Sequence, residues 1–208
     1  MCADALEWLA NHPAEPGTSV VTSLPDVSEL PQRDFEAWRR FFGDAARAVL
    51  DWIPGDGVAI FHQSDIRWRG TWIDKSHWVL CAAEGSAAGL VFHKIVCREP
   101  PGTPSYGRAT FSHLLCFSKR PPQAPRSPAP DVLAGAGFMS WSKAMGEEAC
   151  ALACRFLLDE TTSTTVVDPF CGEGSVLAVA NAFGLSAIGI DVSARKCRLA
   201  RRRVARAP

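Results

Sequence analysis

The feature that most constrains the fold lies near the C-terminus, where a strand-like run meets a glycine-rich turn. Residues 166–175 read VVDPFCGEGS, and a helix is predicted over 175–183. Glycines in such a turn let the backbone approach a ligand closely, and the helix start presents free amide donors. A second predicted strand, 187–190, then ends at Asp191. In nucleotide-binding α/β folds, an acid at this position hydrogen-bonds ribose hydroxyls.

Strand-like and helix-like segments alternate along the whole chain, which favours an α/β fold with helices on the faces of a doubly wound, mostly parallel sheet. The predicted strands are 18–24, 58–63, 90–97, 109–119, 164–167 and 187–190, and the predicted helices are 34–53, 73–83, 142–158, 175–183 and a basic helix from about Ser193. One Pro/Gly-rich turn joins 90–97 to 109–119, so these two strands are expected to form an antiparallel hairpin at the sheet edge. Residues 120–137 contain five prolines and are predicted to be a linker.

The bulk composition is that of an ordinary globular domain. The chain has 208 residues, 47% hydrophobic and 21% charged, with 22 basic and 22 acidic side chains. The balanced charge gives no whole-molecule field that would attract nucleic acid. Seven basic residues and no acid follow Asp191, however. This run is typical of a solvated helix face, and a contact with RNA is the alternative. The residues predicted for that contact are Arg195, Lys196, Arg198, Arg201, Arg202 and Arg203.

Several classes of protein are excluded. No apolar stretch approaches the ~20 residues of a membrane span, and the N-terminus lacks the basic start and apolar block of a secretory signal. The eight cysteines are scattered, without a Cys-x-x-Cys pair or histidines at zinc spacing. We therefore expect no metal site, no disulfide framework and a cytoplasmic location. Cys150 and Cys154 lie in an alanine-rich run and are predicted to be buried thiols.

The glycine-rich turn and the strand after it resemble a known family. The motifs are Asp-Pro-Phe-x-Gly-x-Gly and, after it, Ile-Gly-Ile-Asp. They are similar to the first two cofactor motifs of class I S-adenosylmethionine-dependent methyltransferases, in the form typical of enzymes that methylate amino groups of nucleic acids. The resemblance implies S-adenosyl-L-methionine as cofactor. The implied cofactor-binding residues here are Asp168, Pro169, Phe170, Cys171, Gly172, Gly174, Asp191 and Val192. A nucleoside triphosphate site is not indicated because no Gly-Lys-Ser/Thr follows, and Leu177 occupies the third glycine position of a dehydrogenase.

The order of the motifs differs from the usual order in that family. Members normally begin with this turn and continue through five more strands, whereas one strand and one helix follow it here. Residues 3–9 resemble the end of the third strand, with Asp4 and Ala5 against the adenine, and residues 20–26 occupy the catalytic fourth strand. The resemblance implies a circularly permuted single domain over 1–208, cut between the second and third strands. Residues 1–119 would hold the third-strand tip and the catalytic half, and 138–208 the cofactor-binding half.

The catalytic strand departs from the family pattern. Relatives that methylate amino groups carry Asp, Asn or Ser, then Pro-Pro and an aromatic residue, whereas this chain has Ser23-Leu24-Pro25-Asp26. The predicted catalytic residues are Ser23, Pro25 and Asp26, with Asp65 as a second acid. The departure disfavours methylation of the exocyclic amine of adenine or cytosine. Asp26 would orient the nucleophile or accept a proton from a hydroxyl, a ring nitrogen or a protonated amine, and the alternative is a turn-forming acid that caps the next segment.

The resemblance also covers residues 138–143, which open the helix before the glycine-rich turn. In permuted relatives this segment covers the methionine end of the cofactor, so Ser142 and Lys143 are predicted to contact its carboxylate. The leading hypothesis is an RNA methyltransferase, with transfer RNA as the substrate. Sequence-specific DNA methylation is less favoured, because no segment is long enough for a separate target-recognition domain. The neutral net charge keeps a small-molecule or protein methyltransferase open, and the unusual Ser-Leu-Pro-Asp keeps open a non-catalytic cofactor-binding subunit.

Overall fold

The computed structural model describes residues 1–30, 34–120 and 128–205. Its strands are β1 (Thr18–Thr22), β2 (Val58–Gln63), β3 (Ile66–Trp68), β4 (Thr71–Ile73), β5 (Gly89–Cys97), β6 (Phe111–Ser118), β7 (Val132–Leu133), β8 (Thr165–Asp168) and β9 (Ser186–Gly189). Its helices are α1 (Ala5–Asn11), α2 (Phe35–Trp52), α3 (Lys75–Ala83), α4 (Glu147–Glu160), α5 (Ser175–Ala182) and α6 (Ala194–Ala200), with a 3₁₀ turn η1 (Val27–Glu29).

One seven-stranded sheet runs through the molecule in the order β7-β5-β6-β2-β1-β8-β9. β1 is parallel to both of its neighbours, β2 and β8, and β8 is parallel to β9. β6 is antiparallel to both β2 and β5. The predicted mostly parallel α/β sheet with an antiparallel hairpin toward one edge is thus confirmed. The linker prediction needs a correction, because β7 lies within 120–137 and pairs with β5; residues 121–127 lie outside the described part of the chain.

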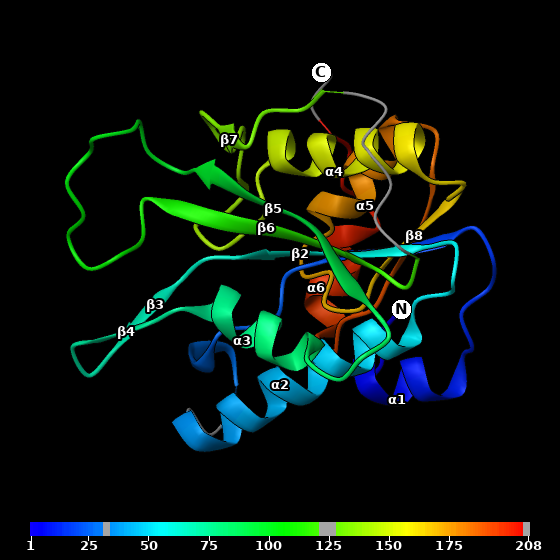
Figure 1. Cartoon of the computed structure of the whole chain (residues 1–208), viewed down its shortest axis with the longest axis horizontal. Helices are drawn as coiled ribbons and strands as arrows, with labels where there is room; N and C mark the ends of the chain where they lie inside the picture. The colour runs from blue at the N-terminus through cyan, green and yellow to red at the C-terminus, as the bar shows by residue number, and fades with distance from the viewer. Residues whose placement is uncertain (31–33, 121–127, 206–208) are drawn as a thin grey trace.

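Helices cover both faces of this sheet. Figure 1 shows α1, α2 and α3 on one face and α4 and α5 on the other. All five residues of β1 and all six of β2 are buried, as expected for central strands covered on both sides. α2 buries Trp38, Phe42 and Val49 along one stripe at helical spacing. Cys150 and Cys154 are buried in α4, as predicted. No helix in the described part of the chain is long and apolar enough to cross a membrane.

The N-terminal segment corrects one prediction. Residues 3–9 were expected to be a strand end, but residues 5–11 form α1. Asp4 caps this helix, since its side chain accepts hydrogen bonds from the amides of Leu6 and Glu7. Only the residues before the cap run beside β9, where Cys2 bridges Asp191 in parallel. The cap therefore ends the strand-like pairing at residue 3.

The segment between β2 and α3 also differs from the prediction. β3 and β4 form a hairpin there, whereas the predicted helix began at Ile73. Arg69 and Gly70 both have positive φ, 48° and 85°, as a two-residue type I′ turn requires. The helix begins only at Lys75, because the Asp74 side chain accepts from the amide of His77. The hairpin follows β2 and the loop follows β5, and both project beyond the same end of the sheet (Figure 1).

The helix predicted over 142–158 begins five residues later, at Glu147. Gly146 precedes it and lies so close to the carbonyl of Ala136 that a Cβ atom would stand 1.9 Å from that oxygen. The amides of Glu147 and Glu148 donate to the carbonyls of Phe138 and Ala136, both at 3.0 Å, and these bonds hold the first turn of the helix. Ser142 and Lys143 consequently lie in a loop before α4.

Replacement of Trp38 by phenylalanine should lower the free energy of unfolding by about 1–3 kcal/mol. Trp38 is fully buried, and its Nε1 donates to the Pro25 carbonyl at 2.9 Å. Without the indole N–H, the Pro25 carbonyl would lose its hydrogen-bond donor. Urea unfolding followed by circular dichroism measures the change. Trp52→Phe in the same helix is the matched control, because the Trp52 Nε1 bond to the His12 carbonyl is exposed. Equal losses in both variants would contradict the prediction.

Candidate functional site

A cavity of about 370 Å³ lies at the carboxyl ends of β1, β8 and β9. The chain leaves β1 toward α2 on one face and leaves β8 toward α5 on the other (Figure 1). This reversal opens a crevice between two adjacent parallel strands, the usual ligand position in such sheets. We call this the first cavity. Its walls are Ala3–Leu6, Ser23–Pro25, Glu29, Leu30, Phe41, Trp141, Lys143–Met145, Asp168–Glu173, Ser175, Val176, Asp191, Val192 and Lys196.

Most of the residues predicted to bind a cofactor meet in the first cavity. The segments that carry Asp4, Asp168 and Asp191 are far apart in sequence but line the same space. Two predicted residues do not line it. Gly174 is absent from its walls, and Ser142 lines a second cavity instead.

The two glycines of the turn have different roles. Gly172 has a φ of 53° and open space where a side chain would stand, so its backbone faces the cavity. Gly174 has a φ of 80°, and a Cβ atom there would lie 2.8 Å from the Cβ of Ala200. Gly174 lets α6 pack against the start of α5, and its contact with a ligand stays a prediction.

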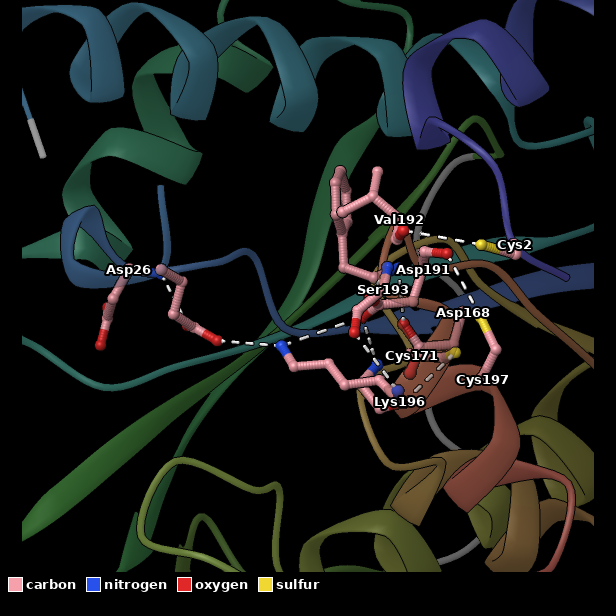
Figure 2. Close-up of polar contacts among 12 residues, drawn as sticks. Cys2, Asp26, Asp168, Cys171, Asp191, Val192, Ser193, Lys196 and Cys197 are labelled. Atoms are coloured by element: carbon pink, nitrogen blue, oxygen red, sulfur yellow. Dashed lines mark hydrogen bonds and ion pairs between the residues drawn. The ribbon is translucent and has the colours of Figure 1, made fainter. Parts of the chain in front are cut away.

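Asp191 closes the first cavity from the end of β9. Its carboxylate accepts hydrogen bonds from the amides of Gly172 at 3.1 Å and Ser193 at 2.7 Å. Figure 2 shows Lys196 lying between Asp191 and the residues around Asp26. The Lys196 ammonium is 4.0 Å from Asp191. Asp191 thus joins the turn, the strand and the start of α6 in one polar cluster.

Two basic residues predicted to contact RNA are engaged inside the protein. Lys196 also pairs with Glu29 at 3.4 Å and lies over the Trp141 ring at 5.6 Å. Arg203 pairs with Glu147 at 3.6 Å and is largely buried. The four remaining residues of the predicted set are exposed, and they are Arg195, Arg198, Arg201 and Arg202.

Asp168 is fully buried at the end of β8. Its Oδ1 accepts a hydrogen bond from the Thr22 hydroxyl at 2.7 Å and one from the Phe170 amide at 3.1 Å. Burial raises the pKa of Asp168 to about 7, the negative charge of Asp191 adds to the rise, and the two hydrogen bonds oppose it. Asp168 therefore titrates near neutral pH.

A second cavity of about 840 Å³ adjoins the first. The two share four wall residues: Ser23, Leu24, Glu29 and Lys143. Three predicted catalytic residues, Ser23, Asp26 and Asp65, line the second cavity, whereas Pro25 lines only the first. The β3–β4 hairpin and the loop between β5 and β6 supply its outer walls. The end of β1 thus lies where the two cavities meet.

Asp26 is ionised between two lysines. It forms an ion pair with the buried Lys75 and lies 3.3 Å from the Lys143 ammonium. Burial raises the pKa of Asp26, but the two ammonium groups outweigh it and the net shift is downward. The Asp26 backbone also begins η1, where its amide donates to the Glu29 carboxylate at 3.0 Å. The residue therefore stands in the second cavity and shapes the following turn.

Asp65 braces the β3–β4 hairpin. Its carboxylate accepts hydrogen bonds at 3.0 Å from the Trp72 indole and from the Lys75 amide. The His113 Nε2 atom lies 3.3 Å from it. Asp65, His113 and Asp74 are close enough together to hold a metal ion. Both carboxylates already accept hydrogen bonds from neighbouring residues, and those to Asp74 come from Ser76 and His77. We therefore interpret this cluster as one that stabilises the fold.

The sequence interpretation missed two side chains of the second cavity. His62 is buried at the end of β2, and burial lowers its pKa to about 3, with Arg98, Lys75 and His113 adding to the shift. Arg98 donates to the Ser64 hydroxyl at 2.8 Å and to the Ser142 carbonyl. His62 is the second-last residue of β2 and Arg98 directly follows β5, and this position at the carboxyl ends of the strands is the signal that could have identified them.

Comparison with known proteins identifies the fold. No protein-family model and no curated protein matches the sequence. Among solved structures, a Thermus thermophilus protein assigned as a DNA modification methylase superposes with a TM-score of 0.76 at 20% identity, over 99% of this chain and 93% of its own. The cytosine-N4-specific PvuII DNA methyltransferase superposes with a TM-score of 0.70 at 17% identity, over 96% and 83%. This chain has the class I methyltransferase fold.

Two related structures contain a ligand. The Thermus thermophilus protein has also been solved with S-adenosyl-L-methionine and superposes in that form with a TM-score of 0.72 at 20% identity, over 95% of this chain and 89% of its own. The M1.HpyAVI–SAM complex superposes with a TM-score of 0.61 at 14% identity, over 96% and 95%. At these identities the likeness is one of fold.

Asp168→Asn should change how stability depends on pH. The pKa of Asp168 is about 7 in the folded protein, against 3.8 for an unperturbed carboxyl. Between these values the folded chain holds a proton that the unfolded chain has released. The stabilisation from this group is therefore fully present below pH 3.8 and is lost as the pH rises through about 7.

Asparagine keeps an acceptor for Thr22 and Phe170 but does not titrate. We expect the melting temperature of the unmodified protein, relative to that of the variant, to be higher at pH 5 than at pH 8. Differential scanning calorimetry over this range measures the difference. An offset that does not change with pH would show that Asp168 does not titrate there.

Proposed function

We propose that this protein is an S-adenosyl-L-methionine-dependent methyltransferase that acts on a base of a nucleic acid. The observation that carries the proposal is the pair of adjoining cavities that meet at Ser23 and Leu24, at the end of β1. The first holds the glycine-rich turn and an acid at the end of the next strand. The second holds an ionised acid, two lysines and projecting loops. The similar solved structures, which carry the names of DNA methyltransferases, support this assignment.

The first cavity suits the cofactor in size and in donor groups. Its volume of about 370 Å³ lies within the ~300–1,000 Å³ common for small-molecule sites. Asp191 would hold the ribose hydroxyls, and Asp4, Ala5 and Val192 would line the adenine. The open backbone of Gly172 would face the methionine portion, with Lys143 near its carboxylate. When bound, the cofactor supplies an activated methyl group.

The protein's contribution to the chemistry is mainly positional. Ser23 and Lys143 line both cavities and would hold the acceptor against the methyl group. We assign Asp26 the role of orienting the acceptor, because a carboxylate whose pKa is held down by two ammonium groups is a poor proton acceptor. The acceptor's proton would leave to solvent through the open second cavity.

We also propose that the domain is circularly permuted, with its halves at 1–119 and 138–208. The turn-bearing strand β8 and its successor β9 are the last strands of the chain, yet β8 lies beside β1 in the sheet. Residues 1–3 lie beside the end of β9, where the amide of Ala3 donates to the Asp191 carbonyl at 3.3 Å. On this proposal, residues 1–3 take the position of the third strand, directly after the second strand β9.

The acceptor would reach the second cavity between the hairpin and the loop from Arg98 to Thr110. The Arg67 guanidinium lies over the Trp72 ring at 5.3 Å, and Tyr106 is 94% exposed. Exposed aromatic and basic groups of this kind stack with bases and pair with phosphates. RNA held by the exposed arginines of α6 is a second candidate, although α6 does not line this cavity in the described structure.

Transfer of label from methyl-tritiated cofactor tests the proposal. Separate reactions would contain DNA, RNA, protein and small-molecule extracts. Label in DNA or RNA is expected, and its distribution between the two decides the kind of nucleic acid. Label only in protein or small molecules would establish the alternative substrate class. Cofactor binding without any transfer would identify a non-catalytic subunit.

Asp191→Asn should weaken binding of S-adenosyl-L-methionine by ~10-fold or more, because it removes a charged acceptor for the ribose hydroxyls. Isothermal titration calorimetry measures the affinity. Asp159→Asn is the control, since Asp159 is an exposed acid of α4 that lines neither cavity. An unchanged affinity in Asp191→Asn would remove the ribose assignment.

Asp26→Asn should lower turnover by ~100-fold or more while sparing cofactor affinity. The substitution keeps the shape but leaves the buried Lys75 ammonium without its partner, so stability should fall as well. Asp26→Asn combined with Lys75→Met removes both charges and should regain stability without regaining turnover. Steady-state kinetics and thermal unfolding together separate the two effects. Near-normal turnover in Asp26→Asn would reduce Asp26 to a turn residue.

A further inference from the structure

The end of β2 carries two adjacent side chains with unpaired buried polar atoms. His62 is 3% exposed and Gln63 is fully buried. Neither the Nε2 atom of His62 nor either polar side-chain atom of Gln63 has a hydrogen-bond partner in the described structure. Each such atom costs about 1–3 kcal/mol of stability, so an unpaired group in a cavity wall is a candidate for pairing with a bound ligand.

The two residues face opposite sides of the sheet, because neighbouring side chains of a strand alternate. His62 is a wall residue of the second cavity, and Gln63 is not among the residues of either cavity. The His62 side chain therefore lies beside a space that can hold a ligand. Gln63 also has unpaired buried polar atoms but lines neither cavity, so it can serve as a control.

The surroundings of His62 hold its ring in the neutral form. Burial and the nearby charges of Arg98, Lys75 and His113 all disfavour protonation. A neutral imidazole has one N–H donor and one nitrogen acceptor. The edges of adenine and cytosine also present a donor amino group beside an acceptor ring nitrogen. The chemistry of the ring thus matches the edge of a base that carries a methyl-accepting amine.

We infer that His62 is a positioning residue that hydrogen-bonds the edge of the methyl-accepting base in the second cavity. This inference rests on the function proposed above. A rotation of the ring about its Cβ–Cγ bond presents a nitrogen to the cavity that the side chain lines. The bound base then satisfies the nitrogen that is unpaired in the free protein. His62 would act on acceptor affinity, while cofactor binding depends on the first cavity.

Three variants test the inference: His62→Leu, His62→Asn and Gln63→Leu. The probes are a single-stranded DNA oligonucleotide containing all four bases and an RNA of the same sequence, each with methyl-tritiated cofactor. His62→Leu should leave the melting temperature equal or higher, since it removes an unpaired polar atom. It should keep cofactor affinity within about twofold but lower kcat/KM for the methylated probe by ~10-fold or more, chiefly through KM.

The other two variants separate a substrate contact from a structural role. Asparagine offers a donor and an acceptor, so His62→Asn should regain part of the lost kcat/KM. Gln63→Leu removes the same kind of defect and should leave kcat/KM within about twofold. Normal kcat/KM in His62→Leu, or an equal loss in Gln63→Leu, would overturn the assignment of His62. A wild-type protein that binds cofactor but methylates neither probe would overturn the proposed nucleic-acid acceptor, and the inference with it.

Discussion

The pairing of β1 with β8 is the interaction on which the rest of the site depends. It places Thr18–Val20 beside Thr165–Val167, which are separated by more than a hundred residues of chain. At the end of this ladder, the Thr22 hydroxyl donates to the buried Asp168 carboxylate. Because the chain leaves the two strands toward opposite faces, their ends cannot be covered by a single connection. The first cavity forms in that gap, and the second opens from the same strand end.

The buried acids of the site are held in different states by their surroundings. Asp168 has no cationic partner in the described structure, and burial raises its pKa to about 7. Asp26 is also largely buried, but Lys75 and Lys143 keep it ionised. Two carboxylates with opposite shifts are typical of sites that assign them different tasks. On the proposed function, Asp168 would lose its proton readily beside a cationic cofactor, whereas Asp26 would keep a fixed negative charge beside the acceptor.

Where the sequence prediction failed, a tertiary contact or a local cap decided the structure. The expected strand over residues 3–9 is replaced by α1, because the Asp4 side chain caps a helix there. α4 starts at Glu147, where the amides of Glu147 and Glu148 donate to the carbonyls of Phe138 and Ala136, the latter in the segment predicted to be a linker. Gly174 matches a cofactor motif, and its lack of a side chain also lets α6 pack against the start of α5. Each outcome depends on a neighbour that periodicity cannot reveal.

The sequence by itself determined the α/β class, most element positions, the glycine-rich turn and the acid at Asp191. These follow from local properties, namely apolar periodicity, glycine conformational freedom and the polar residues that end buried strands. Only the tertiary structure decided that Asp26 pairs with Lys75, that Lys196 turns into the first cavity and that His62 lines the second. Those facts depend on which strand ends become neighbours and on the charges that then face one another. Hydrogen bonding and burial act across space, so they acquire definite partners only after the sheet has formed.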